Sequence, residues 1–133
     1  MSKEYVYPTK EAILTVNEVV NIMSNRKADQ HKLLKPSSFI DGVIEKTRQT
    51  NGNLYDKAGF LLHSLVTTHG FASGNKRTGF ITAIWFLKKN GGKLKVKSFN
   101  KAERIITNIR VFEPTEIAMW LRTGVIDETK IEH

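Results

Sequence analysis

A histidine followed closely by two cations marks the segment of this chain best suited to chemistry. The segment reads His-Gly-Phe-Ala-Ser-Gly-Asn-Lys-Arg and runs from His69 to Arg77. A histidine titrates near neutral pH and can take a proton from a reacting hydroxyl. Lys76 and Arg77 open a predicted helix, where cations oppose the macrodipole by about 0.3–1 kcal/mol each. This unfavourable placement indicates an anion site, because a helix start offers free N–H groups to a phosphate.

The rest of the segment allows a second, purely structural interpretation. Phe71 is a lone large apolar residue suited to anchor a loop to the core, and Gly74 permits a tight turn. On a helical wheel, His69 falls within the apolar stripe of the preceding helix, so we expect it to point towards the interior. An inward histidine is commonly a hydrogen-bonded core residue, and the two cations can reach solvent from a helix start.

The segment resembles the core motif of the Fic/Doc family, H-x-F-x-[D/E]-[G/A]-N-[K/G]-R. Six typed positions agree, namely His69, Phe71, Gly74, Asn75, Lys76 and Arg77. The expected helices of residues 10–122 are compatible with the small Doc-like form of the fold, so the resemblance covers most of the chain. Three features resemble the Doc branch: the chain is short, Lys76 replaces the Gly usual in AMP-transferring Fic enzymes, and no [S/T]-x-x-x-E-[G/N] inhibitory motif occurs.

The resemblance implies a site and a reaction. It makes His69 the general base for a protein hydroxyl and makes Gly74 to Arg77 the cradle of the nucleotide phosphates. In that cradle Asn75 would be a side-chain ligand and Arg77 a charged clamp. Doc proteins transfer the γ-phosphate of ATP to a threonine of elongation factor Tu, whereas Fic enzymes transfer AMP, and Lys76 favours phosphate transfer. The resemblance also implies a toxin that an acidic antitoxin segment silences.

One position departs from the family pattern. Ser73 stands where the family has the Asp or Glu that holds Mg²⁺, and residues 57–102 contain no carboxylate. Because Mg²⁺ prefers oxygen ligands and usually at least one carboxylate, a serine hydroxyl fits only a weakly held ion. Ser73 has a second interpretation as the cap of the following helix. Three functions stay open: an ATP-dependent protein kinase, an AMP-transferring enzyme, and a weakened Fic-fold protein that only binds nucleotide or a partner.

Helical periodicity predicts an all-α fold of about six helices. The expected helices begin after Thr9, at Ser37 or Ser38, at Leu54, near Arg77, at an Asn100–Glu103 capping box, and at Pro114. The fourth is apolar almost all round, so we expect it to be the buried central helix of the bundle.

Other segments carry weaker predictions. The first helix is expected to bury a stripe of Ala12, Val16, Val19, Val20 and Met23. Residues 93–97 alternate lysine with apolar residues and predict one short strand or extended piece. Residues 35–44 are a candidate docking segment for the substrate peptide, and residues 123–133 are expected to be a frayed tail.

Composition and charge restrict the function classes. The absence of cysteine excludes disulfides, thiolate metal sites and a Cys nucleophile. A polar first segment and the lack of a long apolar run predict one cytoplasmic domain over residues 1–133, without a membrane span. Of the net charge of +8, residues 57–102 contribute +9. This basic region predicts an acidic partner or phosphate, and its scarce aromatic residues argue against nucleic acid.

Overall fold

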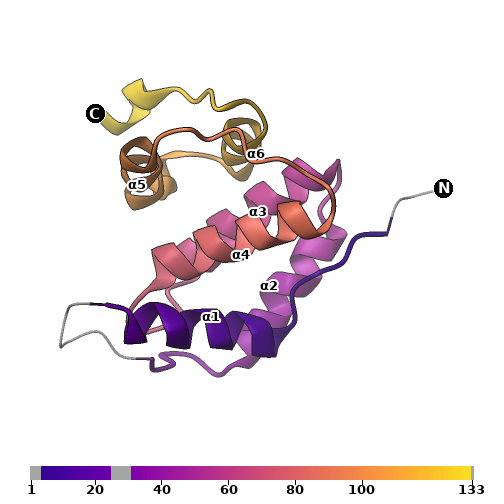
Figure 1. Cartoon of the computed structure of the whole chain (residues 1–133), viewed down its shortest axis with the longest axis vertical. Coiled ribbons are helices and arrows are strands. Elements are labelled where there is room, and N and C mark those ends of the chain that lie inside the picture. The colour runs from indigo at the N-terminus through magenta and orange to yellow at the C-terminus, as the bar shows by residue number, and fades with distance from the viewer. Residues whose placement is uncertain (1–3, 25–30, 133) are drawn as a thin grey trace.

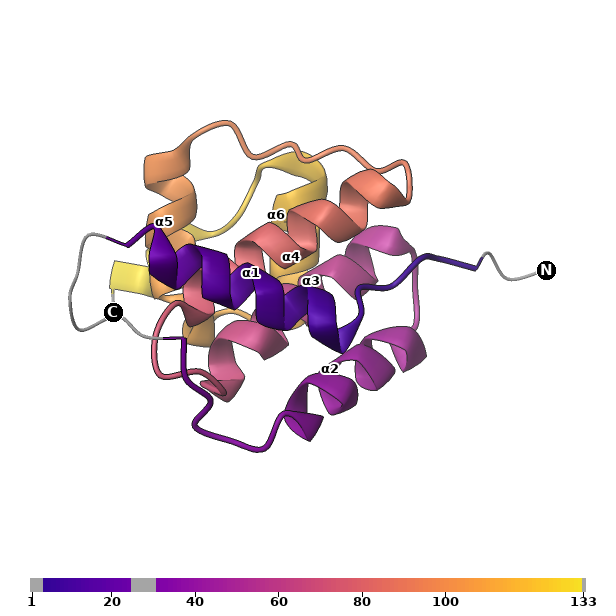
Figure 2. The same cartoon turned by 60° about the horizontal axis from the view of Figure 1, so that its bottom comes forward.

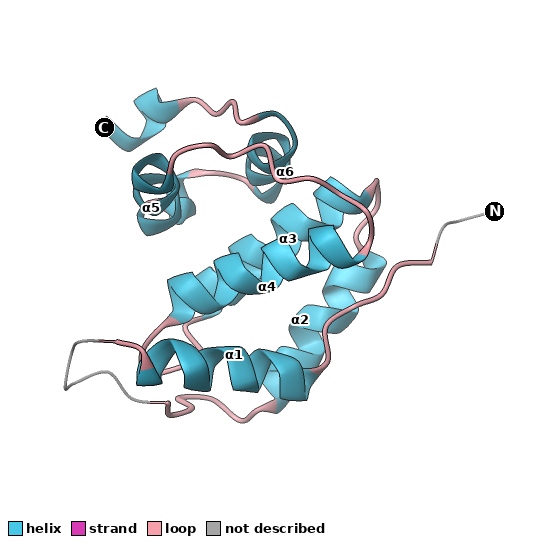
Figure 3. Ribbon diagram, in the orientation of Figure 1, coloured by secondary structure: helices cyan, strands magenta, loops and turns pink. Residues whose placement is uncertain are grey.

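The computed structural model describes residues 4–24 and 31–132. These residues form six α-helices and two short 3-10 helices (Figure 1). The elements are α1 (Lys10–Ile22), α2 (Ser38–Gln49), α3 (Leu54–Thr68), α4 (Asn75–Lys89), α5 (Phe99–Thr107), η1 (Ile109–Val111), α6 (Pro114–Thr123) and η2 (Glu128–Glu132). No strand occurs in this described part (Figure 3), so the all-α prediction is confirmed. None of these helices is long and apolar enough to cross a bilayer.

The central helix of the bundle is α3 and not α4. Helix α3 packs against α2, α4 and α6, and eight of its residues are buried (Figure 1). Helix α4 packs against α3 and α1, but Ile81 and Trp85 on its outer face are 44% and 41% exposed. The prediction was wrong because apolar composition all round a helix does not require a neighbour on every side. Gly79 allows α3 and α4 to approach closely, since a Cβ there would lie 2.9 Å from Val66.

Several helix ends follow directly from local sequence. Thr9 caps α1, and Asn53 forms a reciprocal capping box with Asp56 at the start of α3. Pro114 begins α6 as predicted. The expected capping box of α5 is wrong, because Ser98 is the cap and its hydroxyl accepts from the Lys101 N–H at 3.2 Å.

The inner face of α1 differs from the predicted apolar stripe. The buried residues are Ile13, Asn17, Val20 and Asn21, whereas Val19 and Met23 are 46% and 75% exposed. Helix α1 lies against α4 and α2 (Figure 2). The pattern failed here because two asparagines are buried to make hydrogen bonds, which hydrophobic periodicity does not register.

Two predictions about the C-terminal third have different outcomes. For residues 93–97 the structure has the extended piece and not the short strand; the Lys95 N–H donates to the Leu121 carbonyl at 3.1 Å. The expected frayed tail instead forms η2, where Glu128 binds Arg104 at 2.8 Å and Lys130 binds Glu116 at 2.7 Å. These ion pairs join residues far apart in sequence, so local patterns could not reveal them.

Candidate functional site

The motif segment folds as a loop between two antiparallel helices. Helix α3 ends at His69, which has left-handed backbone angles (φ 51°, ψ 47°), and α4 begins after Gly74, at φ 81°. Glycine adopts such angles without steric cost, whereas a histidine there is uncommon. Since α3 and α4 pack along each other, His69 and the start of α4 lie at the same end of the helix pair.

His69 is exposed, so the expectation that it points inward is wrong. The helical wheel assumed that α3 continues through this residue, but the left-handed backbone turns its side chain away from the apolar stripe. The competing interpretation as a buried, hydrogen-bonded core histidine is therefore also excluded. An exposed imidazole at a helix end is accessible to an external hydroxyl.

The front half of the loop is fixed to the core and to a neighbouring segment. The Phe71 side chain is 2% exposed and meets the Phe39 ring edge-on at 5.5 Å between centroids. The Leu34 N–H donates to the Gly70 carbonyl, and the Ala72 N–H donates to the Lys32 carbonyl, both at 2.8 Å. These two hydrogen bonds form an isolated antiparallel bridge between Leu33 and Phe71. The bridge lies just before the predicted docking segment 35–44, most of which is α2.

Asn75 closes the loop upon itself. Its side-chain oxygen accepts from the Phe71 N–H at 3.1 Å, and its side-chain nitrogen donates to the Phe71 carbonyl at 2.9 Å. In this structure the amide group of Asn75, which the resemblance implies as a nucleotide ligand, holds the loop. Asn75 therefore joins the start of α4 to the front half of the loop and holds the two together.

Two further residues support the loop, and the sequence analysis missed them. Asn17 donates through Nδ2 to the Ser73 carbonyl at 2.9 Å and to the Thr78 hydroxyl at 3.1 Å. Asn21 donates to the same Ser73 carbonyl at 3.3 Å. The available signal was a pair of asparagines one helical turn apart on α1, which pattern analysis treats as a polar surface.

The start of α4 has the properties of an anion site. Its first hydrogen bond runs from the Thr78 N–H to the Gly74 carbonyl at 2.9 Å, so the three preceding N–H groups are those that a helix leaves free. The cap residue is Gly74, without a side-chain hydrogen bond, so Ser73 does not cap this helix. The first turn has no acidic residue, and Lys76 and Arg77 are exposed. Positive charge is thus concentrated at this helix end.

The same loop offers little to a metal ion. No group of three or more His, Asp or Glu side chains in residues 4–24 and 31–132 could hold one. The carbonyl of Ser73 is occupied by the amides of Asn17 and Asn21, which leaves its hydroxyl as the available oxygen. This donor set fits an Mg²⁺ ion held mainly by nucleotide phosphates and water, and not a protein-held metal centre.

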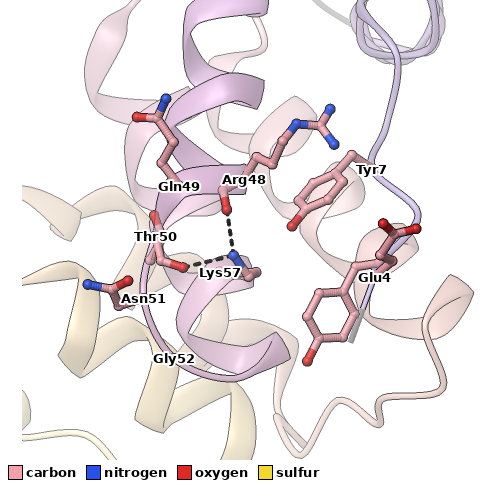
Figure 4. Close-up of a pocket in the computed structure, with 9 residues that line it drawn as sticks. Glu4, Tyr7, Arg48, Gln49, Thr50, Asn51, Gly52 and Lys57 are labelled. Atoms are coloured by element: carbon pink, nitrogen blue, oxygen red, sulfur yellow. Dashed lines mark hydrogen bonds between the residues drawn. The ribbon is translucent and has the colours of Figure 1, made fainter. Parts of the chain in front are cut away.

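Lys57 belongs to the basic region 57–102 in the sequence, but it does not contribute to the exposed basic surface. It is 9% exposed, and its ammonium donates to the carbonyls of Arg48 at 2.7 Å and Thr50 at 2.8 Å (Figure 4). It thus satisfies the C-terminal end of α2, where a cation is favourable. A pocket of about 570 Å³ beside it lies at the opposite end of α3 from the motif. The basic surface consists of the exposed lysines between residues 88 and 97.

Comparison with known proteins agrees with the motif. The Fic/DOC family model matches residues 7–87, which reach from the segment before α1 into α4. The toxin Doc of Mycolicibacterium smegmatis is 30% identical over 109 residues, a match that covers 77% of this chain and 79% of that protein. No solved structure matches this chain. Because the family model matches more than half of the chain and the relative matches most of it, this chain belongs to the Fic/DOC family.

Proposed function

We propose that this chain is a Doc-like phosphotransferase that moves the γ-phosphate of ATP to a hydroxyl of a target protein. The observation that carries the proposal is the pairing of an exposed His69 with the start of α4, which carries two cations and has no side-chain cap, at one end of the bundle. A base and an anion site at the two ends of one short loop are the two parts that hydroxyl phosphorylation needs.

His69, Lys76, Arg77 and the N–H groups at the start of α4 then have defined parts in the reaction. The N–H groups at the start of α4 and the Arg77 guanidinium bind the ATP phosphates, while Lys76 adds positive charge at the same helix end. His69 accepts the proton of the target hydroxyl as its oxygen forms a bond to the γ-phosphorus. The bond between that phosphorus and the β–γ bridging oxygen breaks, and ADP leaves. The Ser73 hydroxyl would contact an Mg²⁺ ion bound to the ATP phosphates, and that ion would supply positive charge against the negative charge of the phosphates.

The family relationship supports a biological role for this reaction. The M. smegmatis relative is named a toxin, and we propose the same role here, with elongation factor Tu as the target that the resemblance implies. A toxin needs a neutralising partner. The exposed lysines between residues 88 and 97 fit an acidic antitoxin segment, which would approach faster at low salt.

Ser73 favours a second candidate function. Without a carboxylate at this position, the chain would bind ATP or a partner and transfer its phosphate slowly or not at all. An AMP-transferring enzyme on the same loop is the third alternative.

Labelled ATP separates these functions in parallel reactions with the target protein. Transfer of the γ-label alone supports phosphotransfer, and transfer of the α-label supports AMP transfer. Nucleotide binding without transfer of either label supports the weakened binder.

A further inference from the structure

Two buried asparagines meet the motif loop on its inner side. Asn17 is 0% exposed and Asn21 is 8% exposed, and both lie on the face of α1 that packs towards α4. Burying an amide side chain is unfavourable unless its donors and acceptors are paired. An apolar residue would complete this helix face more simply, so the hydrogen bonds of the two amides explain their presence.

The Asn17 side chain is fully used. Its two N–H groups donate to the Ser73 carbonyl at 2.9 Å and to the Thr78 hydroxyl at 3.1 Å. Its oxygen accepts from Asn21 Nδ2 at 3.1 Å and faces His31 Nδ1 at 2.8 Å. Because an amide oxygen can only accept, His31 Nδ1 is the donor in this contact. The amide therefore joins α1, the segment at His31 and both ends of the turn that starts α4.

The position of these amides relative to the anion site is specific. Ser73 and Thr78 bracket the three free N–H groups of Asn75 to Arg77 in the sequence. A Cβ at Gly74 would lie 3.2 Å from Asn17 Nδ2 and 3.3 Å from Asn21 Nδ2, so both amides lie directly under the turn. A shift of Asn17 would move both the Ser73 carbonyl before the site and the Thr78 hydroxyl after it, whereas a shift of Asn21 would act on the Ser73 carbonyl and on Asn17.

We propose that Asn17 and Asn21 are positioning residues that set the orientation of the phosphate-binding turn, Asn17 through Ser73 and Thr78 and Asn21 through Ser73 and Asn17 itself. Neither asparagine touches the nucleotide in this scheme. For its consequence on catalysis, the proposal rests on the phosphotransfer function proposed above. Its structural part, that the two amides hold the turn in place, can be tested without any transfer reaction.

The variant Asn17→Ala removes the hydrogen bonds of the Asn17 side chain to Ser73, Thr78 and Asn21. The variant Thr78→Val removes only the hydrogen bond between Asn17 and Thr78. Thr82→Val is a matched control, because Thr82 lies one turn further along α4, is 2% exposed compared with 1% for Thr78, and has a hydroxyl without a hydrogen-bond partner among the described residues. A second control, Ile117→Val, trims the buried core on α6 and lowers global stability away from the loop.

Amide hydrogen exchange tests whether the turn is held. In Asn17→Ala and Thr78→Val we expect the hydrogen-bonded amides of Phe71, Ala72 and Thr78 to exchange about tenfold faster, because local opening becomes easier. The Asn53 amide, bonded to Asp56 at the other end of α3, should keep its rate. Both control variants should leave the loop rates unchanged relative to the Asn53 amide. Unchanged loop exchange in Asn17→Ala overturns the proposal.

ATP binding and transfer test whether holding the turn matters for the site. We expect ATP–Mg²⁺ affinity and transfer rate to fall about 3–10-fold in Thr78→Val and about 10²-fold in Asn17→Ala, the loss typical of a small misplacement of binding groups. Ile117→Val should lower the melting temperature but leave the ATP–Mg²⁺ affinity and the transfer rate unchanged. Faster loop exchange with unchanged binding and transfer would overturn the positioning role. A parent protein that binds ATP but transfers no label would overturn phosphotransfer alone, and the binding series would still decide the positioning claim.

Discussion

Replacing His69 should separate catalysis from stability, and His63 on the same helix supplies the matched control. His69 is exposed and makes no hydrogen bond within residues 4–24 and 31–132. Asparagine tolerates the left-handed backbone that this position requires. His69→Asn should therefore change the free energy of unfolding by no more than about 0.5 kcal/mol, the range for exposed substitutions.

The expected effect on transfer is far larger. A general base contributes about 10²–10⁴-fold, which corresponds to about 2.7–5.4 kcal/mol of activation free energy. His63 should behave in the opposite way, because its Nε2 lies 2.9 Å from the Phe112 carbonyl in a half-buried position away from the loop. His63→Ala loses this hydrogen bond, worth about 1 kcal/mol, and should lower the melting temperature by roughly 4 °C.

Initial transfer rates from γ-labelled ATP and thermal unfolding followed by circular dichroism measure both effects on the same preparations. Rates are compared at a temperature where every variant is folded. The reasoning is refuted if His69→Asn keeps transfer within threefold of the parent. It is equally refuted if His69→Asn unfolds at a lower temperature than His63→Ala, since His69 would then be a structural residue.

Three other changes test separate parts of the account. Arg77→Ala should weaken ATP binding by about 2 kcal/mol, or roughly 30-fold, without loss of stability, since the residue is exposed; calorimetry that finds unchanged affinity would exclude the guanidinium clamp. Ser73→Asp should lower the Mg²⁺ concentration needed for half-maximal transfer and raise the rate, because it adds a charged oxygen beside the cation; superimposable Mg²⁺ titrations would mean that this position has no part in metal binding. The Glu113 N–H and then Lys130 lower the pKa of Glu116, so its contribution to folding is present above the unfolded-state pKa and is lost as the pH falls through the folded-state pKa. Glu116→Gln should make the free energy of unfolding less dependent on pH in that acidic range, and an identical pH profile would contradict this assignment.

The sequence was sufficient to predict those features that depend on residues close together in the chain. The capping signals at Thr9 and Pro114 located the first and last α-helices, and the spacing from His69 to Arg77 identified the family. Each of these features lies within a few residues of chain. Local side-chain chemistry is enough to specify them.

Predictions failed where the structure depends on long-range contacts. The orientation of His69 depends on one left-handed residue, which helical periodicity cannot detect. The role of Asn17 becomes visible only when a carbonyl 56 residues away is brought to it. Lys57 was counted as surface charge, but its position within a buried helix face places its ammonium against the end of α2. In all three cases a polar side chain is placed by backbone geometry or by backbone groups from other segments.

The most direct test of the central claim is mass spectrometry of purified elongation factor Tu after incubation with this protein, ATP and Mg²⁺. The account predicts a single added phosphate on a threonine, present with the parent protein and lost with His69→Asn. An added AMP, or a phosphate that forms equally well with His69→Asn, would contradict the proposal that His69 and the start of α4 form a phosphotransfer site.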